Sequence, residues 1–362
     1  MVFDWSRYTG NIAWLAQRTI YLARHGSHAY GTNIATSDED FRGVAIAPRE
    51  FYLGGLHRFD QAECKSPDLT IFDLRKFVGL AAQANPNVIE VLFVENADRL
   101  QVTAAGERLL SARELFVTRR IRHTFSGYAA SQLKRIRAHR RWLMNPPAAP
   151  PERKAFGLPD TTAIPGDQLL AAEAAIRAQL DAWSADYLDE LDPVIRETIT
   201  GKMTRHLAEM GVAMNEDLWP GAARVIGLDD NFIEYLAREK KYNAAKKEWE
   251  NYQTWRRERN PARAVLEAKF GIDTKHAMHL IRLLRMAREI LETGRVIVRR
   301  PDAEELLSIR NGAWSYERIV DWAEQEDAAL QEVAAKSTLP KAPDVEAIDR
   351  LCVELIGEAI GC

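Results

Sequence analysis

The chain has 362 residues, a formal net charge of −3 and 46% hydrophobic residues, which excludes an intrinsically disordered protein. No stretch approaches the ~18 consecutive apolar residues of a membrane-spanning helix, so no membrane association is expected. At roughly one domain per 150 residues, the length predicts two domains. The N-terminal residues lack the pattern of a secretory signal, and the three cysteines are widely spaced. We therefore expect a cytoplasmic protein without a disulfide framework or structural zinc site.

The N-terminal region alternates between patterns typical of strands and of helices. Strands are predicted over residues 19–24, 41–47 and 68–72, and the last of them leads directly into the helical pattern LRKFVGLAAQA. This alternation predicts a small domain of mixed strands and helices over residues 1–118.

The region after residue 118 has a different character. A proline-rich segment at residues 145–159 predicts a loop or linker. Residues 167–191 and 275–294 carry apolar residues at helical spacing, which predicts amphipathic helices. We therefore predict an α+β chain, with an α-helical domain over residues 119–362.

A glycine-serine pair and two aspartates form the first chemical motif. Gly26 and Ser27 are followed, after ten intervening residues, by Asp38 and Asp40. In a strand, the two-residue period would place Asp38 and Asp40 on one face. Such a pair needs a cation, and a divalent ion that prefers oxygen ligands, chiefly Mg²⁺, suits it best. Gly26 would let the backbone approach a phosphate, and Ser27 adds a hydroxyl.

A third carboxylate from a neighbouring strand would complete a site for two metal ions. Asp68 opens a predicted strand and is the candidate for this position. Glu63 and Asp73 are alternatives, although Asp73 stands where a helix N-cap is needed.

Together these motifs resemble the nucleotidyltransferase superfamily that includes DNA polymerase beta and poly(A) polymerases. Within it the chain is similar to the RNA-repair-associated polymerase-beta family, through GSHAYGT, SDEDFRGV, IFDLRKF, NPNVIEVLF and DTKHAMHLIRLLR. The resemblance implies a mixed sheet with an antiparallel edge and flanking helices. It also implies two Mg²⁺ ions, or Mn²⁺, held by Asp38, Asp40 and Asp68 as metal ligands and catalytic residues. The implied reaction transfers a nucleoside monophosphate from a triphosphate such as ATP. Glu39 departs from the usual apolar residue between the aspartates, and is either solvent-facing or an additional acid of the site.

Other residues are candidates for contacts with the nucleotide. Arg75 and Lys76 could reach the triphosphate, or could be simple surface charges. Lys275 and His276, at the start of a helix that Asp273 or Thr274 would cap, could contact phosphate. His276 and His279 share a helix face, but no cysteine or acid completes a zinc set with them. Glu90, within an apolar run, is expected to face solvent or to cap a neighbouring element, and a role in the site is the alternative.

Two basic stretches favour RNA as a partner. Residues 118–142 contain eight Lys or Arg and no acid, and residues 237–263 contain nine basic and four acidic residues, both with aromatic residues among them. The alternative is that these are solvated helix faces with aromatic residues in the core. We predict transfer to an RNA 3′ end, in a tRNA or a broken RNA. The alternatives are transfer to a protein or small molecule, and a catalytically silent RNA-binding module.

Overall fold

The computed structural model describes residues 3–162, 164–183 and 218–361. The chain divides into two compact units. The first unit contains residues 1–145 and 260–362, and the second contains residues 146–259. The proline-rich segment predicted as a linker lies at the start of the second unit. The predicted domain boundary at residue 118 stays a prediction.

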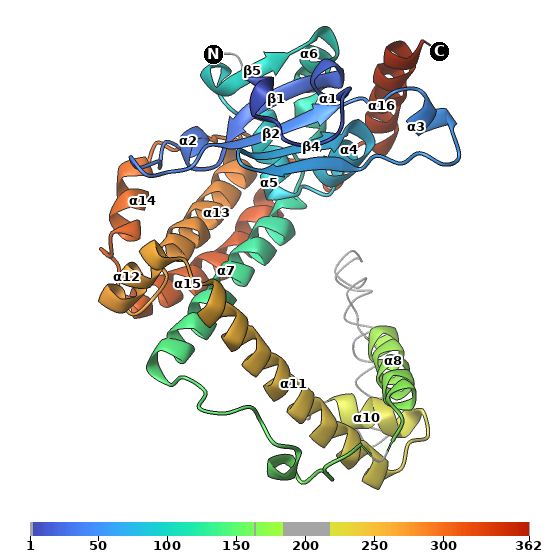
Figure 1. The fold of residues 1–362 in the computed structure, drawn as a ribbon, viewed down its shortest axis with the longest axis vertical. Coiled ribbons are helices and arrows are strands. Elements are labelled where there is room, and N and C mark those ends of the chain that lie inside the picture. Colours follow the sequence, from blue (N-terminus) through green and yellow to red (C-terminus); the bar gives the residue numbers. More distant parts are fainter. Residues whose placement is uncertain (1–2, 163, 184–217, 362) are drawn as a thin grey trace. The chain divides into compact units, whose positions relative to one another are not determined.

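A five-stranded mixed sheet forms the centre of the N-terminal region (Figure 1). The strands are β1 (Thr19–His25), β2 (Asp40–Ala45), β3 (Gln61–Lys65), β4 (Asp68–Asp73) and β5 (Arg99–Val102). Their order is β3-β4-β2-β1-β5, in which β2 and β4 run parallel and the other neighbours run antiparallel. The sheet and the helices around it confirm the α+β class. The three predicted strands correspond to β1, β2 and β4.

Helices surround the sheet in the first unit. From the N-terminal segment come α1 (Leu15–Arg18), α2 (Gly26–Tyr30), α3 (Glu50–Leu53), α4 (Leu74–Ala82), α5 (Pro86–Leu92), α6 (Ala104–Ser111) and α7 (Ile121–Met144). From the C-terminal segment come α12 (Pro261–Phe270), α13 (Thr274–Thr293), α14 (Ala303–Arg310), α15 (Tyr316–Lys336) and α16 (Val345–Ile360). Short 3-10 turns occupy Trp5–Arg7, Asn96–Asp98 and Arg113–Phe116.

Helix α13 joins the two segments of this unit. It begins where Asp273 accepts hydrogen bonds from the backbone N–H groups of Lys275 and His276, as the N-cap prediction required. Its apolar face is buried against α7, α15 and α14, and α5 packs between α7 and β1. One continuous core therefore extends from the sheet into the C-terminal helices. This packing holds the start of α13 opposite the ends of β1 and β2 (Figure 1).

The second unit is helical in its described residues. It contains α8 (Gly166–Trp183), α10 (Leu218–Val225), α11 (Asp230–Glu258) and a 3-10 turn at Arg153–Phe156. A small core around Ile176, Ala222 and Leu236 holds α8, α10 and α11 together. The predicted helix at residues 167–191 is thus confirmed up to residue 183, and the remainder lies outside the described residues.

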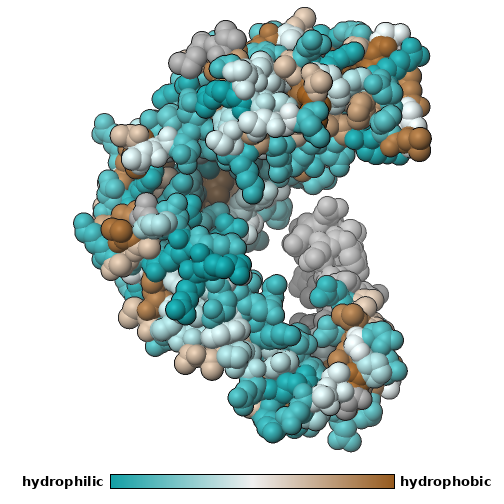
Figure 2. Space-filling model, in the orientation of Figure 1, coloured by the Kyte–Doolittle hydropathy of each residue, from teal (hydrophilic) through white to brown (hydrophobic). Residues whose placement is uncertain are grey.

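The distribution of apolar residues differs between surface and interior. No helix among the described residues is long and apolar enough to cross a membrane. The face in Figure 2 is mainly hydrophilic, with small hydrophobic groups scattered over it. The large apolar side chains are concentrated in the buried clusters.

Candidate active site

The glycine-serine pair lies at the junction of β1 and α2. Gly26 has φ of +65°, a conformation that L side chains rarely adopt. A Cβ atom added there would stand 2.0 Å from the Oδ2 of Asp40, which is less than any tolerated contact. Only glycine therefore lets this junction lie directly against Asp40. Gly26 and Ser27 are the first two residues of the short helix α2.

Asp40 and Asp68 lie side by side at the start of two parallel strands. Asp40 begins β2 and is the register partner of Asp68, which begins β4. Asp38 precedes the strand instead of lying within it, so strand alternation does not determine the direction of its side chain as expected. Asp38 still lines the same cavity as Asp40. Arg42 donates a 2.9 Å hydrogen bond to the carboxylate of Asp68.

The electrostatics of Asp40 indicate a site that would accept a cation. Burial raises the pKa of Asp40, and the neighbouring carboxylate of Asp68 raises it further. Arg42 and His25 lower it, but they do not cancel the increase. A divalent cation between these oxygens would relieve both the repulsion and the cost of desolvation.

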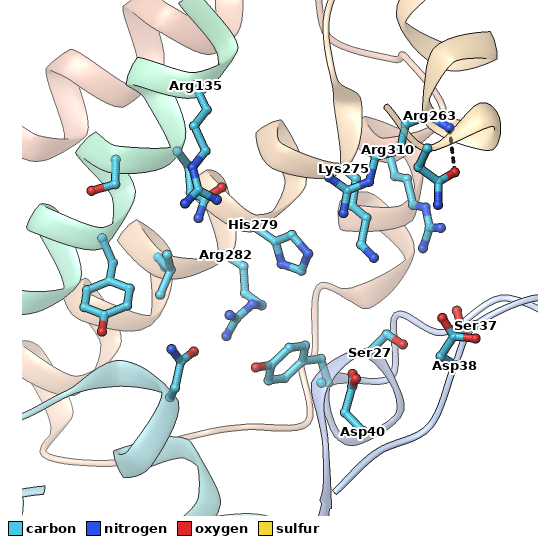
Figure 3. A pocket seen from close by; sticks show the side chains of 18 of the residues that line it. Ser27, Ser37, Asp38, Asp40, Arg135, Arg263, Lys275, His279, Arg282 and Arg310 are labelled. Atoms are coloured by element: carbon cyan, nitrogen blue, oxygen red, sulfur yellow. Dashed lines mark hydrogen bonds between the residues drawn. The ribbon is translucent and has the colours of Figure 1, made fainter. Parts of the chain in front are cut away.

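Asp38 and Asp40 line a cavity of about 630 Å³, within the range of about 300 to 1,000 Å³ that is usual for small-molecule sites, and Asp68 lies beside Asp40. Figure 3 shows Ser27, Asp38 and Asp40 on one side and Lys275, Arg263 and Arg310 on the other. We call the first group, together with Asp68 and Gly26, the acidic wall. We call Lys275, Arg263 and Arg310 the cationic wall.

The cationic wall concentrates positive charge at the start of α13. Burial lowers the pKa of Lys275, and the guanidinium groups of Arg263 and Arg310 lower it further. Arg263 belongs to α12 and Arg310 ends α14, so three separate helices supply these charges. A group of cations that destabilise one another is suited to bind an anionic ligand such as a phosphate chain.

A buried ionic network lies beside the cavity. Glu90 is fully buried, forms an ion pair with Arg282 and accepts a 2.5 Å hydrogen bond from the hydroxyl of Tyr30. Burial opposes ionisation, but Arg282 and His25 hold the pKa of Glu90 near 2. Arg282 also lies 3.8 Å from the centroid of the Tyr30 ring. The expectation that Glu90 faces solvent or caps a neighbour is therefore wrong: this acid anchors two residues that line the cavity.

Some predicted site residues lie elsewhere. Arg75 pairs with Asp73 and covers the ring of Tyr52, and neither Arg75 nor Lys76 lines the cavity. His276 points to Gln132 and Asp273, and burial lowers its pKa to about 4.

Three other acids, Asp73, Glu63 and Glu39, were also candidates for the site. Asp73 caps α4, and Glu63 lies on β3 bonded to Gln61. Glu39 is held by Arg7 and Arg24 and does not line the cavity. None of these three acids reaches the acidic wall.

Four arginines that line the cavity could not be identified as site residues from the sequence. Arg135, Arg263, Arg282 and Arg310 come from four different helices and line the cavity. Each is one basic residue among many on an amphipathic helix. Only the packing of α7, α12, α13 and α14 identifies them.

The two basic stretches differ in structure. In the first, which forms α7, Arg122, Arg137 and Arg140 pair with acids of α15, and Trp142 is buried. In the second, which forms most of α11, the side chains of Lys246 and Lys247 are exposed. The aromatic residues of α11 contact one another, with ring centroids 5.9 Å apart for Trp249 and Tyr252. For α7 the alternative of a helix with ion pairs and core aromatics describes three of the eight basic residues and Trp142.

The mixed five-stranded sheet with its flanking helices is consistent with a polymerase-beta-like fold. Residues 10–144 match the model of a family described as the RNA repair pathway DNA polymerase beta family, which confirms the resemblance for the motifs within those residues. The motif DTKHAMHLIRLLR lies outside the matched region. No curated protein and no solved structure matches the chain. The matched region contains the whole acidic wall, whereas the cationic wall lies outside it.

Proposed function

We propose that this protein is a Mg²⁺-dependent nucleotidyltransferase that transfers a nucleoside monophosphate from a nucleoside triphosphate to the 3′ hydroxyl of an RNA. The observation that carries the proposal is the cavity with Asp38, Asp40 and neighbouring Asp68 on one side and Lys275, Arg263 and Arg310 on the other. A metal-bound triphosphate needs both kinds of surface, since its ion takes carboxylate oxygens and its phosphates take cations.

The acidic wall suits Mg²⁺ in its donor set. Its ligands are carboxylates, which hard divalent cations prefer, and the raised pKa of Asp40 marks a charge that its protein partners leave partly uncompensated. When bound, Mg²⁺ would polarise the phosphates and make the acceptor hydroxyl easier to deprotonate. Asp38, Asp40 and Asp68 would hold the ions, and Asp68 would also be placed to accept the proton of the attacking hydroxyl.

The rest of the cavity would position the substrate. Gly26 leaves space for the backbone to approach the β- and γ-phosphates, and Ser27 would donate a hydroxyl hydrogen bond. Lys275 would bind a phosphate oxygen from the opposite side. Burial and the neighbouring arginines destabilise its charge, and a bound anion would compensate for this. The chain would therefore act mainly through positioning and charge stabilisation, with pyrophosphate as the second product.

The choice of RNA as acceptor rests on different observations. The family is named for an RNA repair pathway, and α11 presents exposed lysines along one helix. Rows of exposed lysines bind the phosphate backbone of nucleic acids without regard to sequence. The paired arginines of α7 support this acceptor less, apart from Arg135, which lines the cavity.

A labelling experiment tests the reaction and the acceptor together. The purified chain is incubated with each α-labelled triphosphate, Mg²⁺ and total RNA, with D38N/D40N as the inactive control. We expect label on RNA from the wild type, lost with the control and with EDTA. Label on the protein would favour protein nucleotidylation instead, and the absence of any label in all four reactions would contradict the transferase.

A further inference from the structure

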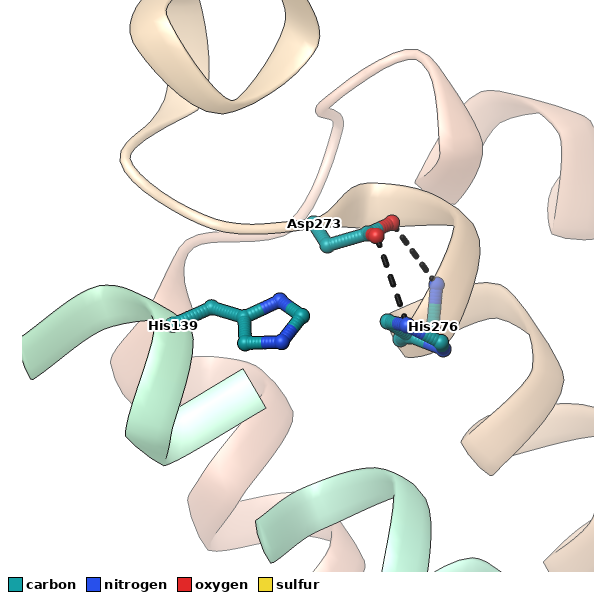
Figure 4. A group of neighbouring side chains, drawn as sticks. All are labelled: His139, Asp273 and His276. Atoms are coloured by element: carbon teal, nitrogen blue, oxygen red, sulfur yellow. Dashed lines mark hydrogen bonds and ion pairs between the residues drawn. The ribbon is translucent and has the colours of Figure 1, made fainter. Parts of the chain in front are cut away.

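A second cluster of potential ligands lies beside the start of α13, outside the cavity lining. His139 on α7 and Asp273 with His276 on α13 each offer a ligand atom, and these atoms all lie within 4.8 Å of one another (Figure 4). Asp273 and His276 are buried, and His139 is half-buried. From this geometry we infer that His139, Asp273 and His276 form a binding site for a Zn²⁺ ion, distinct from the acidic wall.

The spacing within the cluster already approaches that of a zinc site. In a tetrahedral site with ligand distances of about 2.0 to 2.1 Å, neighbouring ligand atoms are about 3.3 Å apart. The Oδ2 of Asp273 and the Nε2 of His276 are 3.4 Å apart, so this edge of the tetrahedron is present without the ion. The ring of His139 is held by stacking on Trp142, and its centroid lies 5.8 Å from that of His276. A small shift of His139 would complete a site of three protein ligands.

The surrounding hydrogen bonds orient one ligand atom each of His276 and Asp273 towards the other. The Nδ1 of His276 donates a 2.7 Å hydrogen bond to the Oε1 of Gln132, so the lone pair of the neutral ring is on Nε2. The Oδ1 of Asp273 accepts the backbone N–H groups that begin α13, while Oδ2 faces His276. Glu267 lies 3.6 Å from the Nδ1 of His139. Carboxylates and carbonyl oxygens behind ligating histidines are the usual second layer of a zinc site.

Arg263 is the competing cation in this cluster. One of its guanidinium nitrogens lies 3.4 Å from Asp273 Oδ2 and 3.4 Å from His276 Nε2. A bound Zn²⁺ would repel this guanidinium, whose side chain is 37% exposed. Arg263 also lines the cavity, so loading of the zinc site would release this arginine from Asp273 towards the phosphate-binding side.

Zinc content and coordination test this inference without measuring activity. The full chain is stripped with a chelator, loaded with Zn²⁺, dialysed and analysed for metal, and Co²⁺ is used as a spectroscopic substitute. The test variants are H139A and D273N. D273N is chosen because asparagine also caps helices, so the start of α13 is preserved while the charged ligand is lost. The matched control is H123A, an exposed histidine on the same helix as His139.

We expect about one zinc per wild-type chain and the visible bands of tetrahedral Co²⁺. H139A and D273N should lower zinc affinity on the order of 10-fold or more, whereas H123A should not. D40N should also retain the ion, which separates this site from the acidic wall. Failure of the wild type to retain zinc would overturn the inference and assign the cluster to Arg263. Equal retention by H139A and D273N, with folding confirmed by circular dichroism, would overturn it as well.

Discussion

The acidic and cationic walls of the cavity are assembled in different ways. The acidic wall comes from residues 26–68: Gly26 and Ser27 begin α2, directly after β1, Asp38 precedes β2, and Asp40 and Asp68 begin the neighbouring strands β2 and β4. The cationic wall comes from α12, α13 and α14, more than 190 residues further along the chain. The acids are positioned by strand register, and the cations by helix packing. The first arrangement leaves a pattern in the sequence, whereas the second leaves almost none.

Loss of an acid should have the largest effect on activity. Asp40 is the central member of the acidic wall, since it contacts the Gly26 junction and pairs in register with Asp68. D40N keeps the shape of the side chain but removes a charged metal ligand. We expect transfer to fall by about 10³-fold or more, because metal-ion stabilisation contributes several kcal/mol to such reactions. The measurement is kcat for label transfer at saturating Mg²⁺.

Glu39 provides the matched control for this experiment. It is adjacent to Asp40, but its carboxylate is held by Arg7 and Arg24. E39Q should therefore change transfer by less than about threefold, since surface ion pairs contribute little. A loss in E39Q as large as that in D40N would mean that the acidic wall is wrongly assigned.

A methyl group at Gly26 should have the second largest effect. In G26A the new Cβ would collide with the Asp40 carboxylate, and the backbone would be strained at φ +65°. Displacing a catalytic group by about 1 Å can lower the rate by about 10²-fold, and we expect a loss of that size in kcat/KM. Gly79 on α4 has open space where a Cβ would be added. G79A should therefore keep full activity, and a similar loss in both variants would point to general destabilisation.

Removal of a cation should affect substrate binding more moderately. K275A removes one charged contact to phosphate, and such contacts contribute about 1.5 to 3 kcal/mol, or roughly 10- to 100-fold. The KM for the triphosphate and the inhibition constant of pyrophosphate should both rise by this factor. Lys76 was predicted from the sequence as a second phosphate contact but does not line the cavity. K76A should leave both constants unchanged, and an equal effect would restore Lys76 to the site.

The difference between the walls also explains what could be predicted from the sequence. The strand alternation identified β1, β2 and β4, and the Gly26, Asp38, Asp40 and Asp68 positions followed from spacing. Lys275 was identified because it follows the helix cap, where a basic residue is unusual. Strands β3 and β5 were missed because they are short edge strands of four or five residues.

Charge patterns gave less reliable predictions, for a physical reason. The basic stretches at residues 118–142 and 237–263 are both rich in Lys and Arg, yet Arg122, Arg137 and Arg140 are neutralised by α15 acids about 180 to 200 residues away. Similarly, Glu90 is charged and buried because Arg282 on a distant helix pairs with it. A linear pattern records which charges are present, but the partners that neutralise them depend on the tertiary fold.

The smallest predicted effect concerns the stability of the acidic wall as pH changes. The folded state raises the pKa of Asp40, so it binds that proton more tightly than the unfolded chain does. The stability that this group contributes is present below the unfolded pKa and is lost as pH rises through the raised folded pKa.

In metal-free buffer at pH 7, D40N should therefore melt a few degrees above the wild type. The difference should shrink as the pH is lowered past the raised pKa, and Mg²⁺ should stabilise the wild type more than D40N, because it binds the ionised folded site. Thermal melts of both proteins between about pH 4 and 8 would measure this difference, because this range begins near the usual carboxyl pKa and extends well above it. A difference in melting temperature that is independent of pH and of Mg²⁺ would mean that burial and the Asp68 carboxylate do not destabilise the ionised form of Asp40.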